Sequence, residues 1–241
     1  MSLAQNLALI RQQIADACRR AGRSEAEVAL MAVSKMHPVE AVAEAYAAGL
    51  RLFGENRVQE WQLKFPSLQD LFTGTPDAAH MHLIGPLQSN KANRAAELFD
   101  AIDSVDSLRI ATRLNAATRV LNRKLPILIE VKLSHEESKH GISPAELPAL
   151  LAALEPLESL IPAGLMTVPP WSEDPEPARP HFRELRRLRD ASLAACPALT
   201  QLSMGMSNDF AVAIEEGSSC VRIGTALFGG RLYPAAEPNH P

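Results

Sequence analysis

The chain has 241 residues, of which 46% are hydrophobic and 22% charged, a composition that predicts a globular protein with a full core and excludes a disordered or fibrous chain. Its 24 lysines and arginines against 28 aspartates and glutamates give a formal net charge of -4, so charge alone does not favour binding to nucleic acid or to an anionic membrane. Only six of the basic residues are lysines, so chemistry that needs a primary amine has few candidates.

Cysteine usage and the N-terminus indicate a cytoplasmic protein. Cys18, Cys196 and Cys220 form no CxxC pair and lie far apart in the sequence, which argues against a disulfide framework and against a zinc site. The first 22 residues lack the basic segment and uninterrupted apolar core of a secretory or transit signal, and no apolar run approaches the roughly 18 residues of a membrane helix. We therefore expect no membrane partner.

The N-terminal segment is predicted to be one amphipathic helix over residues 1–22. Gly22 supplies its end signal, because glycine commonly follows the last turn of a helix. The apolar residues that recur at helical spacing are Leu3, Leu7, Ile10, Ile14 and Cys18.

After this helix, short apolar runs alternate with helical stretches. Strands are predicted at residues 28–33, 51–53, 81–84, 101–105, 127–133, 160–166, 200–203 and 220–223. Helices are predicted at residues 39–48, 91–98, 180–195 and 210–216. A further helix is predicted to begin at about residue 58, and two others are predicted to end at residues 122 and 154. Strict alternation implies parallel strands with crossover helices, and eight units in this length predict an α/β protein with a (β/α)8 TIM barrel. A doubly wound open sheet is the alternative, but no GxGxxG fingerprint follows the first strand.

Residues 1–230 are expected to form a single domain, since no linker divides them. The proline-rich stretch 168–180 is interpreted as one long loop, and residues 231–241 as a loose C-terminal tail. In a barrel of this type the site lies at the C-terminal ends of the strands, so the residues that follow each apolar run are the candidates for function.

Lys35 directly follows the first predicted strand. By the two-residue period of a strand it shares a face with Met31 and Val33, so its side chain is expected to project inwards at the mouth of the barrel. Its position leaves two interpretations open: a lysine that extends to solvent, or a Schiff-base lysine whose desolvated, neutral amine attacks an aldehyde. Lys132, on the same face as Glu130, is the competing amine, with an ion pair as its expected role.

Segments rich in glycine and hydroxyl groups follow the seventh and eighth predicted strands, where barrels of this type commonly bind phosphate. Gly205 and Gly224 allow close backbone approach, and Ser207 and Thr225 supply small donors. Ordinary turn chemistry is the alternative, since residues 207–209 can also cap the next helix. Both interpretations stay open.

Four further residues are candidates for the same mouth, each with a structural alternative. Arg222 ends an apolar run, where a cation must meet either a ligand or a barrel carboxylate such as Glu130. His82 can also be a hydrogen-bonded core histidine. Asn56 can simply start a helix, and Met166 can serve packing.

Eight segments form one ordered set through nearly the whole chain: AVSKMHP (32–38), FGENRVQE (53–60), HLIGPLQSNK (82–91), SVDS (104–107), EESKHGI (136–142), GLMTVPP (164–170), LSMGMSNDF (202–210) and VRIGTALFG (221–229). This set resembles the pyridoxal phosphate homeostasis protein family, which is similar to the N-terminal barrel domain of bacterial alanine racemase. The resemblance is to a full-length member rather than to a shared fold.

The resemblance implies a fold type III protein that carries pyridoxal 5′-phosphate (PLP) on Lys35 as a Schiff base, with Arg222 facing the pyridine nitrogen. The residues that match its phosphate-binding positions are Ser207, Gly224 and Thr225, with Ser203 nearby. The residues that match other positions of the cofactor pocket are Asn56, His82 and Met166. No metal site is implied.

Three positions depart from the family pattern. HLIG replaces the more usual HFIG, Arg57 stands where an aromatic residue is common, and Lys132 stands where asparagine is usual. Lys132 adds a charge near the expected pocket, which affects the expected cofactor affinity more than the cofactor's identity.

The expected ring partner bears on activity. A guanidinium beside the ring nitrogen favours the unprotonated ring and weakens PLP as an electron sink, which disfavours carbanion chemistry. Alanine racemase uses the same ring partner but adds a second acid–base group from a C-terminal domain, for which we expect 241 residues to leave no room.

We therefore expect a non-enzymatic, monomeric protein that binds, stores and delivers PLP in vitamin B6 homeostasis, with PLP-dependent apoenzymes as acceptors. Two alternatives remain: a PLP-dependent amino-acid racemase with a barrel-only site, and a PLP-free lyase in which Lys35 forms a Schiff base with a sugar phosphate.

Overall fold

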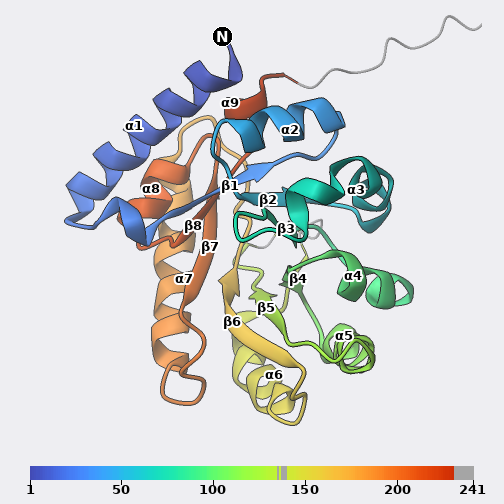
Figure 1. Cartoon of the computed structure of the whole chain (residues 1–241). Helices are drawn as coiled ribbons and strands as arrows, with labels where there is room; N and C mark the ends of the chain where they lie inside the picture. The colour runs from blue at the N-terminus through green and yellow to red at the C-terminus, as the bar shows by residue number, and fades with distance from the viewer. Residues whose placement is uncertain (135, 137–139, 231–241) are drawn as a thin grey trace, which may run out of the picture.

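Strands and helices alternate around one closed parallel barrel (Figure 1). The computed structural model describes residues 1–134, 136 and 140–230. The strands are β1 (Ala29–Val33), β2 (Leu52–Glu55), β3 (His80–Leu83), β4 (Ala101–Val105), β5 (Leu125–Glu130), β6 (Leu160–Met166), β7 (Gln201–Met206) and β8 (Cys220–Ile223). The helices are α1 (Leu3–Ala21), α2 (Val39–Ala47), α3 (Val58–Phe72), α4 (Ala92–Leu98), α5 (Leu108–Val120), α6 (Leu147–Leu154), α7 (Arg179–Ser192), α8 (Phe210–Glu215) and α9 (Thr225–Phe228). Each strand pairs with its sequence neighbours and β8 pairs with β1, which confirms the predicted TIM barrel.

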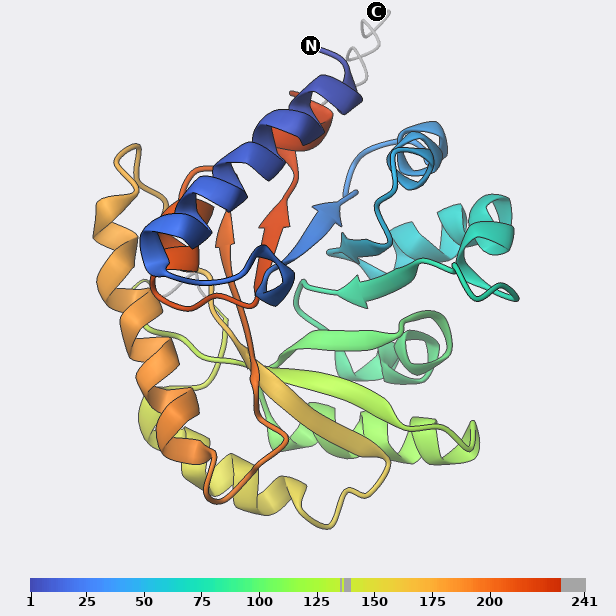
Figure 2. The same cartoon turned by 60° about the vertical axis from the view of Figure 1, so that its left-hand side comes forward.

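The N-terminal helix α1 lies outside the barrel, against α8 and α9 (Figure 2). The Ser2 side chain accepts a hydrogen bond from the Gln5 amide, and Gly22 ends the helix with φ 65°. The Asn6 side chain donates to the Leu227 carbonyl at 2.9 Å and so ties α1 to α9. The buried face contains the residues whose spacing predicted it: Leu3, Leu7, Ile10, Ile14 and Cys18, together with Ala17.

Successive residues of β2 face the helix layer and the barrel interior in turn. Phe53 points outwards, because its ring packs edge-on against Phe72 of α3 with centroids 5.4 Å apart. Gly54 points inwards, because a Cβ built on it would lie 2.7 Å from Sδ of Met31. Glu55 therefore shares the outward face with Phe53, and its side chain is fully buried beneath α3.

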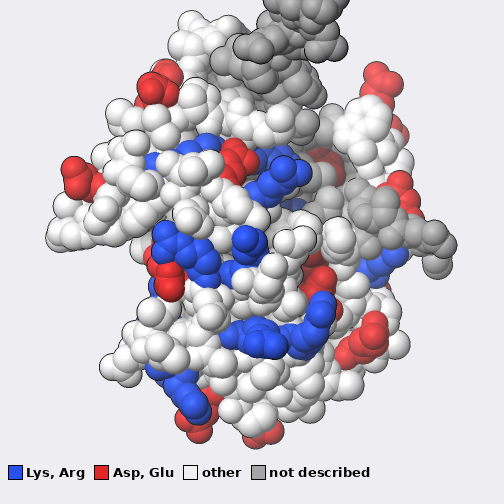
Figure 3. Space-filling model, turned by 90° about the vertical axis from the view of Figure 1, so that its right-hand side faces the viewer, with Lys and Arg blue, Asp and Glu red and all other residues white. Residues whose placement is uncertain are grey.

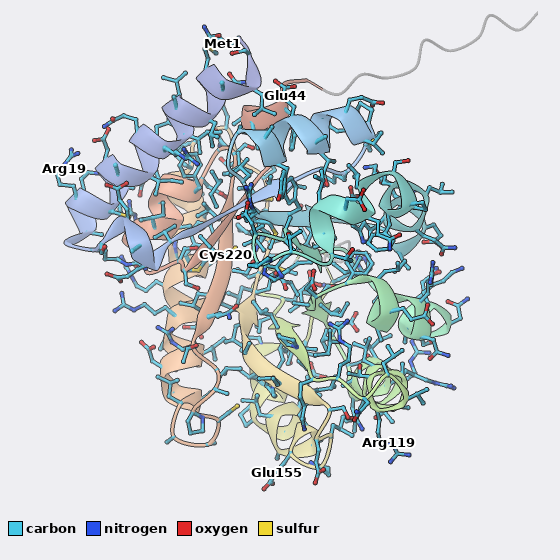
Figure 4. The ribbon with its side chains drawn as sticks, viewed as in Figure 1. Met1, Arg19, Glu44, Arg119, Glu155 and Cys220 are labelled. Carbon is cyan, nitrogen blue, oxygen red and sulfur yellow. The ribbon has the colours of Figure 1, made fainter. Side chains whose placement is uncertain are left out.

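The barrel interior contains buried polar groups as well as apolar ones. Figure 4 shows Cys220 among the barrel strands, whereas Arg19, Arg119 and Glu155 lie at the periphery. Burial raises the pKa of the Cys220 thiol to about 12, so this cysteine is a neutral packing residue at physiological pH.

One predicted strand, 127–133, is wrong at its C-terminal end. β5 ends at Glu130, and the Lys132 amide donates to the Ile142 carbonyl at 2.8 Å, so the chain there pairs with a returning segment. Gly141 makes this return possible, since it has φ 111° and a Cβ on it would lie 2.8 Å from the Glu130 carbonyl oxygen. The pairing is tertiary and leaves no trace in local periodicity.

The described residues end at Gly230, shortly after α9, and the predicted tail at 231–241 lies outside them. None of the helices in the described ranges is long and apolar enough to cross a membrane. Lysine and arginine side chains on the face shown in Figure 3 form several groups, with acidic and uncharged surface between them.

Candidate functional site

A cavity of about 550 Å³ lies where the C-terminal ends of the barrel strands converge. This volume is in the range that holds a small molecule or a cofactor. Its walls are Val33, Lys35, Asn56, Ile84, Val168, Trp171, Ser172, Met206, Ser207, Asn208, Asp209, Arg222, Gly224 and Thr225. Six of the nine residues predicted from the sequence are therefore brought together here: Lys35, Asn56, Ser207, Arg222, Gly224 and Thr225.

Lys35 lies in the turn that follows β1 and is half-buried. The His37 amide donates to the Ser34 carbonyl at 3.1 Å and closes this turn. Lys35 and Val33 both line the cavity, in agreement with the inward projection that strand alternation predicts. Lys35 therefore borders this cavity rather than an outer face of the barrel.

Arg222 brings a buried positive charge to the same cavity. It lies in β8, is 4% exposed, and donates to the Ser203 hydroxyl at 2.7 Å and to the Thr167 carbonyl at 2.8 Å. Burial lowers the pKa of its guanidinium, and nearby carboxylates, Asp103 and Asp209 among them, act in the opposite direction. Because arginine stays protonated even when perturbed, the cavity contains a fixed cation held from two sides.

The ends of β7 and β8 meet at one side of the cavity. Ser207 follows β7, and its hydroxyl accepts a hydrogen bond from the Ala226 amide at 3.3 Å. Gly224 and Thr225 lie at the start of α9, a short helix that the sequence did not predict. Two small hydroxyl side chains, Ser207 and Thr225, thus face one cavity from neighbouring strand ends.

Three predicted residues lie in the barrel strands beside this cavity rather than among the residues that line it. Ser203 contacts Arg222 through its hydroxyl, and Met166 is fully buried at the end of β6. His82 lies in β3, with Nδ1 3.0 Å from Oδ1 of Asp103. Burial lowers the pKa of His82, but the charge and hydrogen bond of Asp103 outweigh this, and the net pKa is raised.

The loop after β6 also contributes to the cavity, which the sequence did not predict. Trp171 lines the cavity while 75% exposed, and the Asn208 side chain donates to the Ser172 carbonyl at 2.8 Å. The Asp209 side chain accepts a hydrogen bond from the Met206 amide at 2.6 Å. Asp209 thus has the ordinary turn role that the sequence offered as the alternative to phosphate binding for residues 207–209. The proline-rich composition indicated a loop, but only tertiary contacts place it.

A second cavity of about 850 Å³ adjoins the first through Asn56. Its walls are Asn56, Arg57, Val58, Gln59, Pro86, Leu87, Gln88, Lys91 and His140. Lys132, the position that departs from the family pattern, is half-buried just beyond β5 and lines neither of these two cavities.

The barrel, with a lysine after its first strand and a buried arginine in its last, defines the class of the alanine racemase N-terminal domain. The model of that family matches residues 5–232. Alanine racemase of Clostridium difficile 630 superimposes with a TM-score of 0.72, covering 97% of this chain and 56% of that chain, and at 16% identity it shares the fold alone.

Relatives over the full length define the class further. Pyridoxal phosphate homeostasis proteins are 42% identical in Aquifex aeolicus over 97% of this chain and 100% of that protein, and 44% identical in Escherichia coli over 96% and 97%. The structure of PipY from Synechococcus elongatus with PLP bound is 41% identical, with a TM-score of 0.83, and covers 95% of this chain and 100% of that chain. The chain belongs to the pyridoxal phosphate homeostasis protein family.

Proposed function

We propose that this protein binds PLP covalently through Lys35 and stores and delivers it in vitamin B6 homeostasis. The observation that carries the proposal is that Lys35, Arg222 and the hydroxyls of Ser207 and Thr225 line one cavity. The names of the full-length relatives and the PLP-bound PipY structure support it.

The groups around the cavity fit the parts of PLP. PLP supplies a reactive aldehyde and an electron-withdrawing ring when bound. The Lys35 amine would condense with this aldehyde to give a C=N bond, and its two hydrogens would leave with the aldehyde oxygen as water. Arg222 donates towards the ring nitrogen, and Ser207 and Thr225 donate to the phosphate beside Gly224.

The charge of Arg222 supports little or no amino-acid turnover. The hydroxyl of Ser203 and the carbonyl of Thr167 hold the guanidinium in place. A permanently charged donor beside the ring nitrogen keeps the ring unprotonated and therefore weakens its withdrawal of electrons from a substrate. This charge favours binding and release of the cofactor over chemistry on amino acids.

Borohydride trapping followed by peptide mass spectrometry tests the proposed linkage. We expect one reduced PLP adduct per chain, on Lys35, and none in Lys35→Ala. Lys124→Ala is the matched control, because the Lys124 ammonium contacts the Glu158 carbonyl, away from the cavity. An adduct on another lysine, or none in the wild type, contradicts the proposal, and an adduct with a sugar phosphate in place of PLP favours a lyase.

Asp209 is the observation that keeps an amino-acid racemase as a second candidate. Its carboxyl lines the same cavity as Lys35, and burial raises its pKa. Racemisation exchanges the Cα proton, so the PLP-loaded protein is incubated with single amino acids in deuterated water. We expect no more deuterium in the product than free PLP produces. Incorporation that Asp209→Asn abolishes favours the racemase.

We propose further that the protein is a cytoplasmic monomer whose acceptors are PLP-dependent apoenzymes. The mild net charge of -4 supports neither a nucleic-acid nor an anionic membrane partner. Transfer is tested by mixing PLP-loaded protein with an apoenzyme in the presence of a scavenger of free PLP. We expect the apoenzyme to be reactivated despite the scavenger. If the scavenger abolishes reactivation completely, direct delivery is contradicted.

A further inference from the structure

A buried cluster of charged residues lies behind the Lys35 turn, on the side of β1 and β2 that faces α3. The Lys64 ammonium lies 2.8 Å from Oε1 of Glu55 and 2.7 Å from Oε1 of Glu60. The side chains of Lys64, Glu55 and Glu60 are 11%, 0% and 23% exposed. None of the three lines the cavity at the barrel mouth.

The cluster binds the Lys35 turn on both sides of Lys35. Before it, the Ser34 hydroxyl donates to Glu55 at 2.8 Å, and the Ser34 carbonyl accepts from the Lys64 ammonium at 3.0 Å. After it, the Met36 amide donates to Oε1 of Glu60 at 2.5 Å. The residues that flank Lys35 are therefore held by charged partners.

The turn needs such partners because its conformation is costly. Met36 has φ 62°, a left-handed conformation that is unfavourable for an L-residue with a long side chain. A strained backbone of this kind persists only where its surroundings fix it. The bond from the Met36 amide to Glu60 fixes the strained residue itself.

Stability alone does not explain the charges. Apolar residues in place of a buried ion pair are often as stabilising, and α3 buries Trp61 and Leu68 on the same inner side. The three protons of the Lys64 ammonium match three acceptors: Glu55, Glu60 and the Ser34 carbonyl. Removal of Lys64 thus takes away the one donor that the Ser34 carbonyl and both carboxylates share.

We propose that Lys64, bridged between Glu55 and Glu60, is a positioning residue that fixes the Lys35 turn and so directs the Lys35 amine into the cofactor cavity. The inference rests on the proposed PLP function, and it assigns to α3 a role in the covalent step. Positioning affects formation of the C=N bond and leaves the contacts to the ring and phosphate in place.

Two ligands separate positioning from general stability in the variant Lys64→Met. PLP uses the Lys35 amine, whereas 4-deoxypyridoxine 5′-phosphate has no aldehyde and relies on the remaining contacts. We expect the rate of borohydride-trappable adduct formation and the PLP affinity to fall about tenfold or more, as for a misplaced reacting group. Affinity for the deoxy analogue is expected to stay within about twofold.

Three variants complete the experiment. Lys64→Arg keeps the charge and is expected to restore most of the trapping rate, while Lys124→Met controls for loss of a lysine at the other end of the barrel. Should Lys64→Met not fold in a thermal melt, Glu60→Gln, a partly exposed site, tests the same contact to Met36 and is expected to slow trapping about threefold or more.

Each result either supports or overturns the positioning role of Lys64. An unchanged rate of adduct trapping in folded Lys64→Met overturns the positioning role. If Lys64→Met does not fold, an unchanged trapping rate in Glu60→Gln overturns it. An equal loss of affinity for both ligands also overturns it. A wild type that forms no adduct with PLP overturns the proposed function instead, so the two failures are distinct.

Discussion

Thr225 and Ser207 approach the cavity from neighbouring strand ends, yet they differ in what else they contact. The Ser207 hydroxyl accepts from the Ala226 amide and so also ties β7 to α9, whereas Thr225 is exposed at the start of that helix. We therefore expect loss of the Thr225 hydroxyl to affect the proposed phosphate contact with little effect on the fold.

For Thr225→Ala we expect PLP affinity to fall about tenfold, the equivalent of one charge-assisted hydrogen bond to the phosphate. Affinity for pyridoxal, which has no phosphate, is expected to change less than about twofold. Quenching of Trp171, whose indole lines the cavity, is the measurement for both ligands. Thr112→Ala, at an exposed position of α5, is the control, and an equal loss for both ligands contradicts the phosphate role.

The His82–Asp103 pair makes part of the stability depend on pH. The net pKa of His82 is raised, so the folded state favours the protonated imidazole. This contribution is present in full below the ordinary histidine pKa and is lost as pH rises through the folded-state pKa. The melting temperature should therefore decline by a few degrees on the alkaline side of neutrality, since about 1 kcal/mol corresponds to about 2–4 °C in a chain of this size.

His82→Asn removes the titrating group while keeping a donor near Asp103. We expect its melting temperature to be lower than that of the wild type near pH 6 and the difference to shrink towards pH 9. Thermal melts across this range are the measurement. A constant difference between the two proteins shows that His82 does not titrate against Asp103.

At the scale of elements, two strand-to-helix junctions use glycine for different reasons. Gly205 has φ 95°, and a Cβ on it would lie 2.6 Å from Cβ of Ala213, so only glycine lets α8 pack on β7. Gly224, between β8 and α9, has negative φ, and its nearest neighbour to an added Cβ is the Val33 carbonyl oxygen at 3.4 Å. The first junction serves folding and the second borders the cavity.

The two alanine variants should therefore differ, one in thermal stability and the other in PLP binding. Gly205→Ala is expected to cost about 2–4 kcal/mol from strain and overpacking, a loss of roughly 5–15 °C in melting temperature. Gly224→Ala should melt within about 2 °C of the wild type and bind PLP more weakly, because its methyl group occupies the cavity wall. Thermal melts and PLP titration of both variants test this, and a melting loss confined to Gly224→Ala contradicts it.

Periodicity predicted the elements well, because strand alternation and helical spacing are local properties. Strand alternation put Lys35 on the same inward face as Met31 and Val33, and Lys35 does line the cavity. Periodicity failed where contacts join distant segments: β5 ends at Glu130, and the chain beyond it pairs with Ile142. The bond from Lys64 to Ser34 spans 30 residues and follows no sequence period.

At the scale of the whole molecule, the closed barrel joins the first and last strands, and the cavity draws its walls from both. Lys35 follows β1, Arg222 lies in β8, and the two strands are paired directly, with Met31 opposite Arg222. A ligand attached to Lys35 and held by Arg222 and Thr225 therefore bridges the ends of the described barrel. Binding of such a ligand should stabilise the entire fold, because unfolding must break this bridge.

We expect saturation with PLP to raise the melting temperature by about 5–10 °C, since a ligand at about a hundred times its dissociation constant contributes about 2.7 kcal/mol. Lys35→Ala should retain a smaller increase, because contacts to ring and phosphate remain while the covalent link is gone.

For a monomer, the midpoint of the PLP-free protein is independent of protein concentration, and light scattering should give a mass near 26.1 kDa. Differential scanning fluorimetry over a concentration series makes both measurements, and a midpoint that rises with protein concentration would mean that association, rather than the closed barrel alone, supports the site.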